Sequence, residues 1–167
     1  KAALLKEGLQ SVAAYVFSGC TNLEELEIPS TVSSFPASGS IMQNCSNLVR
    51  LVVGAPDNLT TGVFRAGTAT KDKLQEVVIG GGVKSVGSYA FSSSSSSSYA
   101  LRSTTANARL VIEEGVESLE KNAFYNCTAF TEIVLPESLT TIGDQTRINQ
   151  ASHRFLRSRF PSLSEST

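Results

Sequence analysis

Few residues in this chain have the type and spacing that chemistry would require. It contains one histidine, His153, and three cysteines, Cys20, Cys45 and Cys127. The cysteines are too few for a disulfide scaffold and lack the C-x-x-C or Cys/His spacing of a zinc site. The glycine run at 80–82 lacks the Lys-Ser/Thr that completes a phosphate-binding loop. We therefore expect no enzyme, no metal site and no cofactor.

Two sets of polar residues could suggest a calcium site or a nucleophile, but their spacing supports neither. One set consists of four acidic residues, Glu113, Glu114, Glu117 and Glu120. They lack the Asp-x-Asp-x-Gly spacing of a calcium-binding loop, so we expect them to lie on a solvated face. A recurring hydroxyl row has no His or Lys repeating beside it to activate a nucleophile. This row, expected on a solvated second edge, comprises Ser11, Ser34, Ser85, Ser118 and Thr141.

A short repeated phrase accounts for most of the chain. In each copy an apolar-x-apolar strand is followed by a turn, a second short apolar pair and often an aromatic. The second apolar residue of each strand recurs after 23, 25, 26, 33 and 23 residues, at Leu5, Ile28, Val53, Ile79, Ile112 and Leu135. Repeats of this length are typical of solenoids, in which each coil packs on its neighbours. The sequence predicts about six coils over residues 1–146, with a loop inserted at 92–107.

The cysteines follow the same repeat. Cys20 and Cys45 are 25 residues apart, which is the local repeat length. We expect all three cysteines to be small, reduced and shielded core residues, since free Cys behaves as a small apolar side chain. A disulfide between Cys20 and Cys45 on adjacent coils is the alternative in an oxidising compartment.

This phrase resembles the BspA-type leucine-rich repeat. The resemblance is carried by residues 28–32, by residues 83–91, and by residues 116–119 with 122–127. It implies an α/β repeat solenoid: a right-handed superhelix with a parallel β-sheet on its concave face and short helical or 3-10 turns. It also implies a protein of host-associated bacteria or some protists, secreted or on the cell surface, that acts in adhesion to host proteins or other cells. No catalytic or binding residues are shared across the family, so none is transferred.

Alternation along the strands predicts which side chains face solvent. One predicted outward row is a ladder of alternating charge that includes Arg50, Glu76, Arg109 and Glu132. The next row carries four successive valines, Val52, Val78, Val111 and Val134. We interpret the charged row as a device that fixes the register of neighbouring strands, and the alternative is a charged surface that binds a ligand. The valine row is explained either by strand propensity or by a protein-binding stripe. These eight residues are the candidate protein-binding site.

The last segment, residues 147–167, differs in composition from the repeats. It carries four arginines against one glutamate. Ile148, Ala151, Phe155, Leu156 and Phe160 fall on one helical face before Pro161. A C-terminal cap helix over the last coil is one interpretation. A flexible basic tail and a truncated further repeat are the others.

Charge and composition limit the classes of partner that we expect. The 167-residue chain has a formal net charge of −1, so no global field would attract nucleic acid. No apolar run approaches the roughly 20 residues that span a bilayer, so membrane insertion is not expected. The chain begins at Lys1 without a signal-peptide pattern, so the extracellular or cell-surface location comes from the resemblance. The expected partner is a host extracellular protein or another cell surface; the alternative function is a structural spacer in a larger cell-envelope protein.

Overall fold

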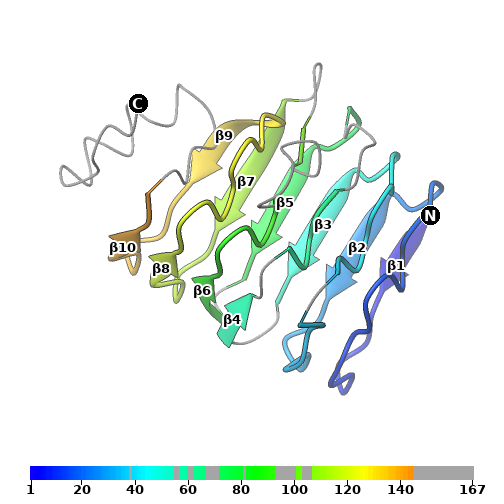
Figure 1. Cartoon of the computed structure of the whole chain (residues 1–167), viewed down its shortest axis with the longest axis horizontal. Coiled ribbons are helices and arrows are strands. Elements are labelled where there is room, and N and C mark those ends of the chain that lie inside the picture. The colour runs from blue at the N-terminus through cyan, green and yellow to red at the C-terminus, as the bar shows by residue number, and fades with distance from the viewer. Residues whose placement is uncertain are drawn as a thin grey trace.

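The computed structural model is a stack of coils with two parallel sheets on its walls (Figure 1). It describes residues 1–37, 39–54, 57–59, 62–66, 72–80, 82–92, 101–102 and 107–144. The large sheet has six strands in the order β1-β2-β3-β5-β7-β9, and every neighbouring pair is parallel. These strands are β1 (Ala2–Leu4), β2 (Glu25–Ile28), β3 (Arg50–Val53), β5 (Glu76–Ile79), β7 (Ala108–Ile112) and β9 (Phe130–Val134).

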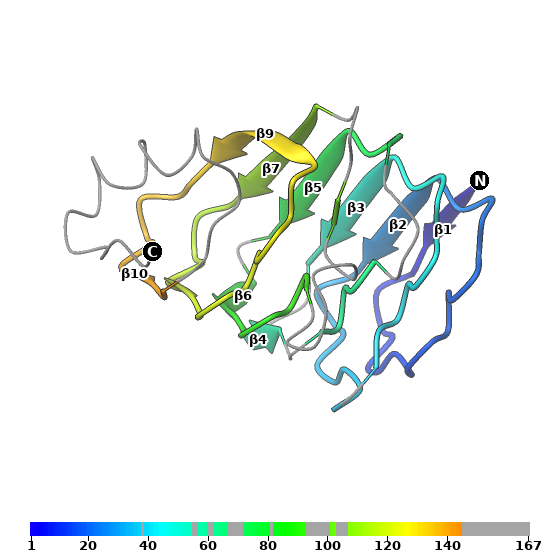
Figure 2. The ribbon, with the colours of Figure 1, turned by 45° about the horizontal axis from the view of Figure 1, so that its top comes forward.

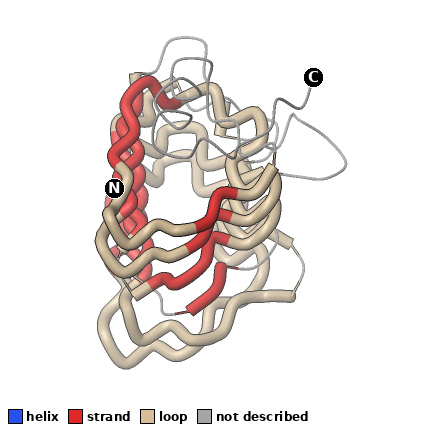
Figure 3. Tube along the Cα trace, turned by 90° about the vertical axis from the view of Figure 1, so that its left-hand side faces the viewer, coloured by secondary structure: helices blue, strands red, loops and turns tan. Residues whose placement is uncertain are grey.

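A smaller sheet of four strands lies across the coils from the large one (Figure 3). Its order is β10-β8-β6-β4, and its pairs are also parallel. The strands are β4 (Asp57–Leu59), β6 (Val83–Val86), β8 (Ser118–Leu119) and β10 (Thr141–Ile142). An isolated parallel bridge between Ser11 and Ser34 continues the same wall into the first two coils. The predicted parallel-strand solenoid is therefore confirmed.

The short helical turns predicted from the resemblance are not found in the described residues, where the coil corners are turns (Figure 3). The reason is the backbone at each corner. Left-handed residues recur four positions apart, as at Asn122 (φ 61°) and Asn126 (φ 58°). A helix needs an unbroken run of right-handed residues, and Asn is among the few side chains that adopt left-handed φ readily. The corners therefore hold isolated backbone hydrogen bonds, such as Tyr125 N to Asn122 O and Cys127 N to Phe124 O.

Apolar side chains from successive coils stack into columns between the two walls. The predicted strand anchors Ile28, Val53, Ile79 and Ile112 are buried, whereas Leu5 and Leu135 at the two ends are only partly buried. A second column consists of phenylalanines. Phe64 stacks on Phe91 with ring centroids 5.2 Å apart, and Phe91 on Phe124 at 4.8 Å. These separations match the roughly 4.8 Å spacing of paired strands, so one ring per coil stays in contact with the next.

The long interval between Ile79 and Ile112 does not disturb the register of the large sheet. Glu76 still pairs with Arg109, and Ile79 with Ile112. The strands advance along the stack without interruption in a second view (Figure 2). Of the predicted inserted loop 92–107, only Ser92, Leu101, Arg102 and Asn107 are described. The predicted cap helix or basic tail at 147–167, with His153, lies outside the described residues.

Candidate functional site

The register of the large sheet assembles both outward rows that the sequence analysis proposed. Parallel pairing aligns one row across the six strands, and it reads Ala2, Glu25, Arg50, Glu76, Arg109 and Glu132. Two residues further along each strand runs a second row, which reads Leu4, Glu27, Val52, Val78, Val111 and Val134. The eight candidate residues therefore lie side by side on the face of the sheet opposite the buried strand anchors.

Ion pairs join neighbouring residues of the charged row. Arg50 Nε lies 3.0 Å from Glu76 Oε2, and Arg109 Nε lies 2.8 Å from Glu132 Oε1. Each arginine uses the same nitrogen and reaches the strand that follows it in the sheet. All four side chains keep substantial exposure, so each pair is worth about 0.2–1 kcal/mol. A shift of register would separate the members of each pair, so the pairs favour the observed alignment.

The valine row is more enclosed than alternation alone predicts. Val78 is buried at 9% exposure, whereas Val52, Val111 and Val134 are partly buried. The prediction of a freely exposed stripe is therefore wrong for Val78. Its neighbours in the row, Val52 and Val111, stand one strand spacing away on either side. The row is thus a shallow apolar strip with its centre at Val78.

The hydroxyl row lies on the smaller sheet. Ser85 pairs in register with Ser118, and Ser118 with Thr141. Ser118 Oγ donates to Ser85 Oγ at 2.8 Å, and Ser85 Oγ donates to Glu120 Oε1 at 3.3 Å. Sequence reasoning left the third coil out of this row, but Asn58 of β4 pairs with Ser85 and occupies the position. The sequence analysis missed Asn58 because its side chain is an amide and not a hydroxyl. Asn58 nevertheless directly precedes an apolar residue, Leu59, as the hydroxyl residues of the row do in the other coils.

The cysteines are free, and they differ in environment. Cys45 and Cys127 are buried, whereas Cys20 in the first coil is partly exposed, so the prediction of three shielded thiols is wrong for Cys20. Cys45 Sγ donates to Phe17 O at 3.1 Å, and Cys127 Sγ to Phe91 O at 3.6 Å. Burial raises the pKa of the Cys127 thiol from 9.0 to about 12, although a backbone hydrogen bond involving Leu101 acts in the opposite sense. This thiol therefore stays protonated and unreactive at neutral pH.

Two glutamates link neighbouring coils through their turns, a role that the sequence analysis missed. Glu114 Oε1 accepts from Glu137 N at 2.6 Å and Glu114 Oε2 from Ser138 N at 3.1 Å. Glu7 accepts in the same manner from Ser30 N at 3.3 Å, at the equivalent turn between the first two coils. In both places a glycine follows the glutamate, Gly8 or Gly115, with φ near 100°. The Glu-Gly-apolar triplet, which occurs at 7–9 and 114–116, was the available signal.

Neither a metal-binding cluster nor a membrane-spanning helix is found among the described residues. No group of three or more His, Cys, Asp and Glu in the described ranges is arranged to hold a metal ion. Within the same ranges, no helix is long and apolar enough to cross a membrane. What the face offers instead is a rigid strip of β-branched side chains beside a row of ion pairs.

Comparison with known proteins shows one matching family and two similar structures. The family described as BspA type leucine rich repeat region matches residues 2–106 and 97–153, in six copies. A leucine-rich repeat protein of T. pallidum is 20% identical with a TM-score of 0.48, over 98% of this chain and 85% of that one. A leucine-rich repeat protein from Bacteroides ovatus is 18% identical with a TM-score of 0.30, over 99% of this chain and 53% of that one. No curated protein matches the chain.

Proposed function

Since the chain belongs to the BspA-type leucine-rich repeat family, we propose that it is a non-enzymatic adhesion module whose large sheet binds a protein partner. Repeats of this family are generally protein-interaction modules and typically non-enzymatic. The family is typically bacterial, and its members are on the cell surface or secreted. For this chain we propose an extracellular or cell-surface location, with the face of the large sheet as the concave binding surface.

The observation that carries the proposal is the valine row across four adjacent strands. Val52, Val78, Val111 and Val134 stand in register, so they form one strip about 14 Å long at the usual strand spacing. Valine has one strongly restricted side-chain torsion, so each valine loses little side-chain entropy when a partner packs on it. The strip is therefore preorganised for contact with an apolar partner surface.

The charged row supplies the polar border of this surface. Protein interfaces commonly combine an apolar centre with a polar rim. Here the pairs Arg50–Glu76 and Arg109–Glu132 run alongside the valines, two residues earlier on each strand. Because each pair is internally neutralised, the part of the rim beside the four valines carries no net charge that would select a strongly acidic or basic partner. We expect a partner with an apolar ridge flanked by uncharged polar groups.

The test is adhesion of microspheres that carry the purified chain. Coated spheres are counted on mammalian cell monolayers and on bacterial cells, against spheres coated with albumin. Val111→Glu introduces a charge into the strip at a partly buried position, and it should reduce adhesion to the albumin level. Val78 is a poorer probe because it is buried. The matched control is Ser34→Glu, which adds the same side chain at an exposed position on the opposite wall.

Circular dichroism melts establish that both variants fold. Adhesion that survives Val111→Glu unchanged would show that the binding face lies elsewhere. Adhesion lost equally in Ser34→Glu would remove the assignment to the large sheet. If the wild-type spheres bind neither type of cell, the adhesion proposal fails, and a structural spacer in a larger cell-envelope protein becomes the better account.

A further inference from the structure

One position in the valine row carries a charge. In register across the large sheet the row reads Leu4, Glu27, Val52, Val78, Val111 and Val134, so Glu27 of β2 interrupts an otherwise apolar series. Glu27 is partly buried, whereas Leu26 and Ile28 on either side of it along the strand are buried in the core. The Glu27 carboxylate therefore lies on the outer face of the sheet, at the β2 end of the strip formed by the four valines.

Glu25 and Glu27, which we call the acidic pair, have no ion-pair partner among the described residues. Glu25 is exposed and lies two residues before Glu27, in the charged row. Arg50 stands beside Glu25 in register, but its Nε binds Glu76 on the other side at 3.0 Å. The two rows contain four glutamates against two arginines, so their uncompensated negative charge lies on β2.

Stability does not account for a glutamate at position 27. The same row holds valine in the next four strands, so an apolar residue fits this position. A partly buried carboxylate without a partner loses hydration and gains no hydrogen bond in return. We therefore expect Glu27 to cost some stability relative to valine, and a contact outside the fold gives the better account of it.

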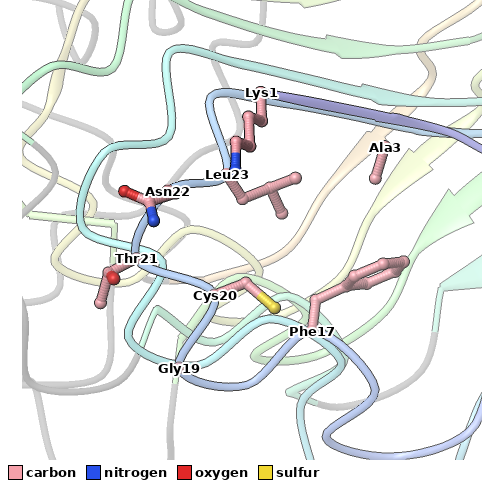
Figure 4. Close-up of a pocket in the computed structure, with 8 residues that line it drawn as sticks. All are labelled: Lys1, Ala3, Phe17, Gly19, Cys20, Thr21, Asn22 and Leu23. Carbon is pink, nitrogen blue, oxygen red and sulfur yellow. The ribbon is translucent and has the colours of Figure 1, made fainter.

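The acidic pair lies on the open face of the sheet and not in a pocket. A hollow of about 390 Å³ near β1 has Ala3 and Phe17 among its lining residues, as the close-up shows (Figure 4). Ala3 pairs in register with the buried Leu26, so the hollow is on the inner side of the sheet, away from the acidic pair. Small molecules usually bind in concave sites. A ligand of the acidic pair therefore lies across the sheet, as a protein segment does.

An organic cation suits the acidic pair better than a metal ion. Calcium takes about six to eight oxygen ligands, and the pair supplies only two carboxylates. No group of three or more His, Cys, Asp and Glu in the part of the chain that the structure describes is arranged to hold a metal ion. Lysine and arginine side chains, in contrast, form strong charge-assisted hydrogen bonds with one or two carboxylates.

We propose that the acidic pair selects a partner segment in which a lysine or arginine lies at one end of an apolar stretch. This inference rests on the proposed protein-binding function of the large sheet, and it adds the charge and the direction of the bound segment. At the usual strand spacing, the cationic group lies about 5 Å beyond the contact with Val52 and about 19 Å from the contact with Val134. The ion pairs beside the valines are internally neutralised, so the attraction acts at the β2 end of the strip.

Peptide selection tests the proposal without a known partner. Phage that display random peptides of about 12 residues, twice the extended length that crosses the strip and β2, are selected on the immobilised chain. Prior depletion on the Val111→Glu variant leaves peptides that depend on the strip, and we expect them to carry Lys or Arg at one end of an apolar stretch. The double variant Glu25→Gln, Glu27→Gln should enrich apolar stretches without the basic residue. The matched control, Glu117→Gln, removes an exposed carboxylate from the smaller sheet side and should enrich the same peptides as the wild type.

Fluorescence anisotropy with one selected peptide, synthesised and labelled, then measures the contribution of Glu27. Glu27→Gln should raise the dissociation constant about tenfold, because a hydrogen bond between two charged groups is lost. Replacing the basic residue of the peptide by Gln should have a similar effect on the wild type and little further effect on Glu27→Gln. In thermal melts, Glu27→Gln and Glu27→Val should be at least as stable as the wild type, which a structural role for Glu27 would not allow.

The selection separates this proposal from the function on which it rests. Apolar peptides without Lys or Arg on the wild-type chain would overturn the proposal and leave the protein-binding function in place. If no enriched peptide depends on Val111, the protein-binding function of the sheet fails, and this proposal fails with it. An equal loss of affinity in Glu117→Gln would assign the preference to net charge and would also overturn the proposal. So would a lower melting temperature of Glu27→Gln, which would make Glu27 a structural residue.

Discussion

Replacement of Phe91 tests whether the aromatic column joins the coils into one cooperative unit. Phe91 is fully buried and stacks on both neighbours, with ring centroids 5.2 Å from Phe64 and 4.8 Å from Phe124. Neighbouring coils hold each other in place only through such interfaces, because a solenoid lacks contacts between distant repeats. Loss of this ring therefore weakens two coil interfaces at once.

The magnitude follows from these contacts. Phe91→Ala removes a fully buried ring and leaves a cavity, which costs about 3–5 kcal/mol. Phe91→Leu keeps most of the apolar volume and removes two aromatic pairs of about 0.5–1.5 kcal/mol each, so about 1–3 kcal/mol is expected. Since domains are stable by only about 5–15 kcal/mol, Phe91→Leu is the more reliable variant to measure.

Urea unfolding followed by far-UV circular dichroism gives the free energy of unfolding and the m-value. The control is Phe35→Leu, because Phe35 is partly buried and has one edge contact, with Phe64 at 5.9 Å. We expect Phe91→Leu to cost more than Phe35→Leu, and Phe91→Ala to lower the m-value as the two halves unfold separately. Equal costs for the two leucine variants would refute the stacking account.

Three further predictions concern the thiols, the turns and the charged row. In the native protein a thiol reagent should label Cys20 first and leave Cys127 unlabelled at pH 8, as followed by mass spectrometry, because Cys127 is buried and its pKa is raised to about 12; rapid labelling of Cys127 would contradict its burial. Glu114→Ala should lower the free energy of unfolding by about 0.5–1.5 kcal/mol in urea titrations, since it removes the acceptors for two backbone N–H groups. Arg50→Ala and Glu76→Ala should each destabilise by about 0.2–1 kcal/mol and the double variant should cost less than the sum of the two, whereas additive losses in the thermodynamic cycle would exclude a pairwise interaction.

The sequence by itself determined the repeat and the alignment of its coils. Because strand side chains alternate and the repeat interval recurs, the partners of Glu76 and Val78 on both neighbouring strands follow from the spacing of the repeats alone, and each pairing is found. The interval of 33 residues was also interpretable, since an insertion at a coil corner does not alter the strand that follows it.

Only the tertiary structure decided the features that depend on neighbouring coils. The corners are turns rather than helical, because left-handed residues such as Asn122 and Asn126 interrupt them, and a repeat pattern does not report φ. Val78 is buried whereas Val111, which also has a valine on each side, is only partly buried, and the repeat pattern does not reveal that difference. Cys20 and Cys45 occupy equivalent positions in sequence but differ in burial, because Cys20 belongs to the first coil. Periodicity specifies a residue's direction, whereas burial depends on which other coils pack against it.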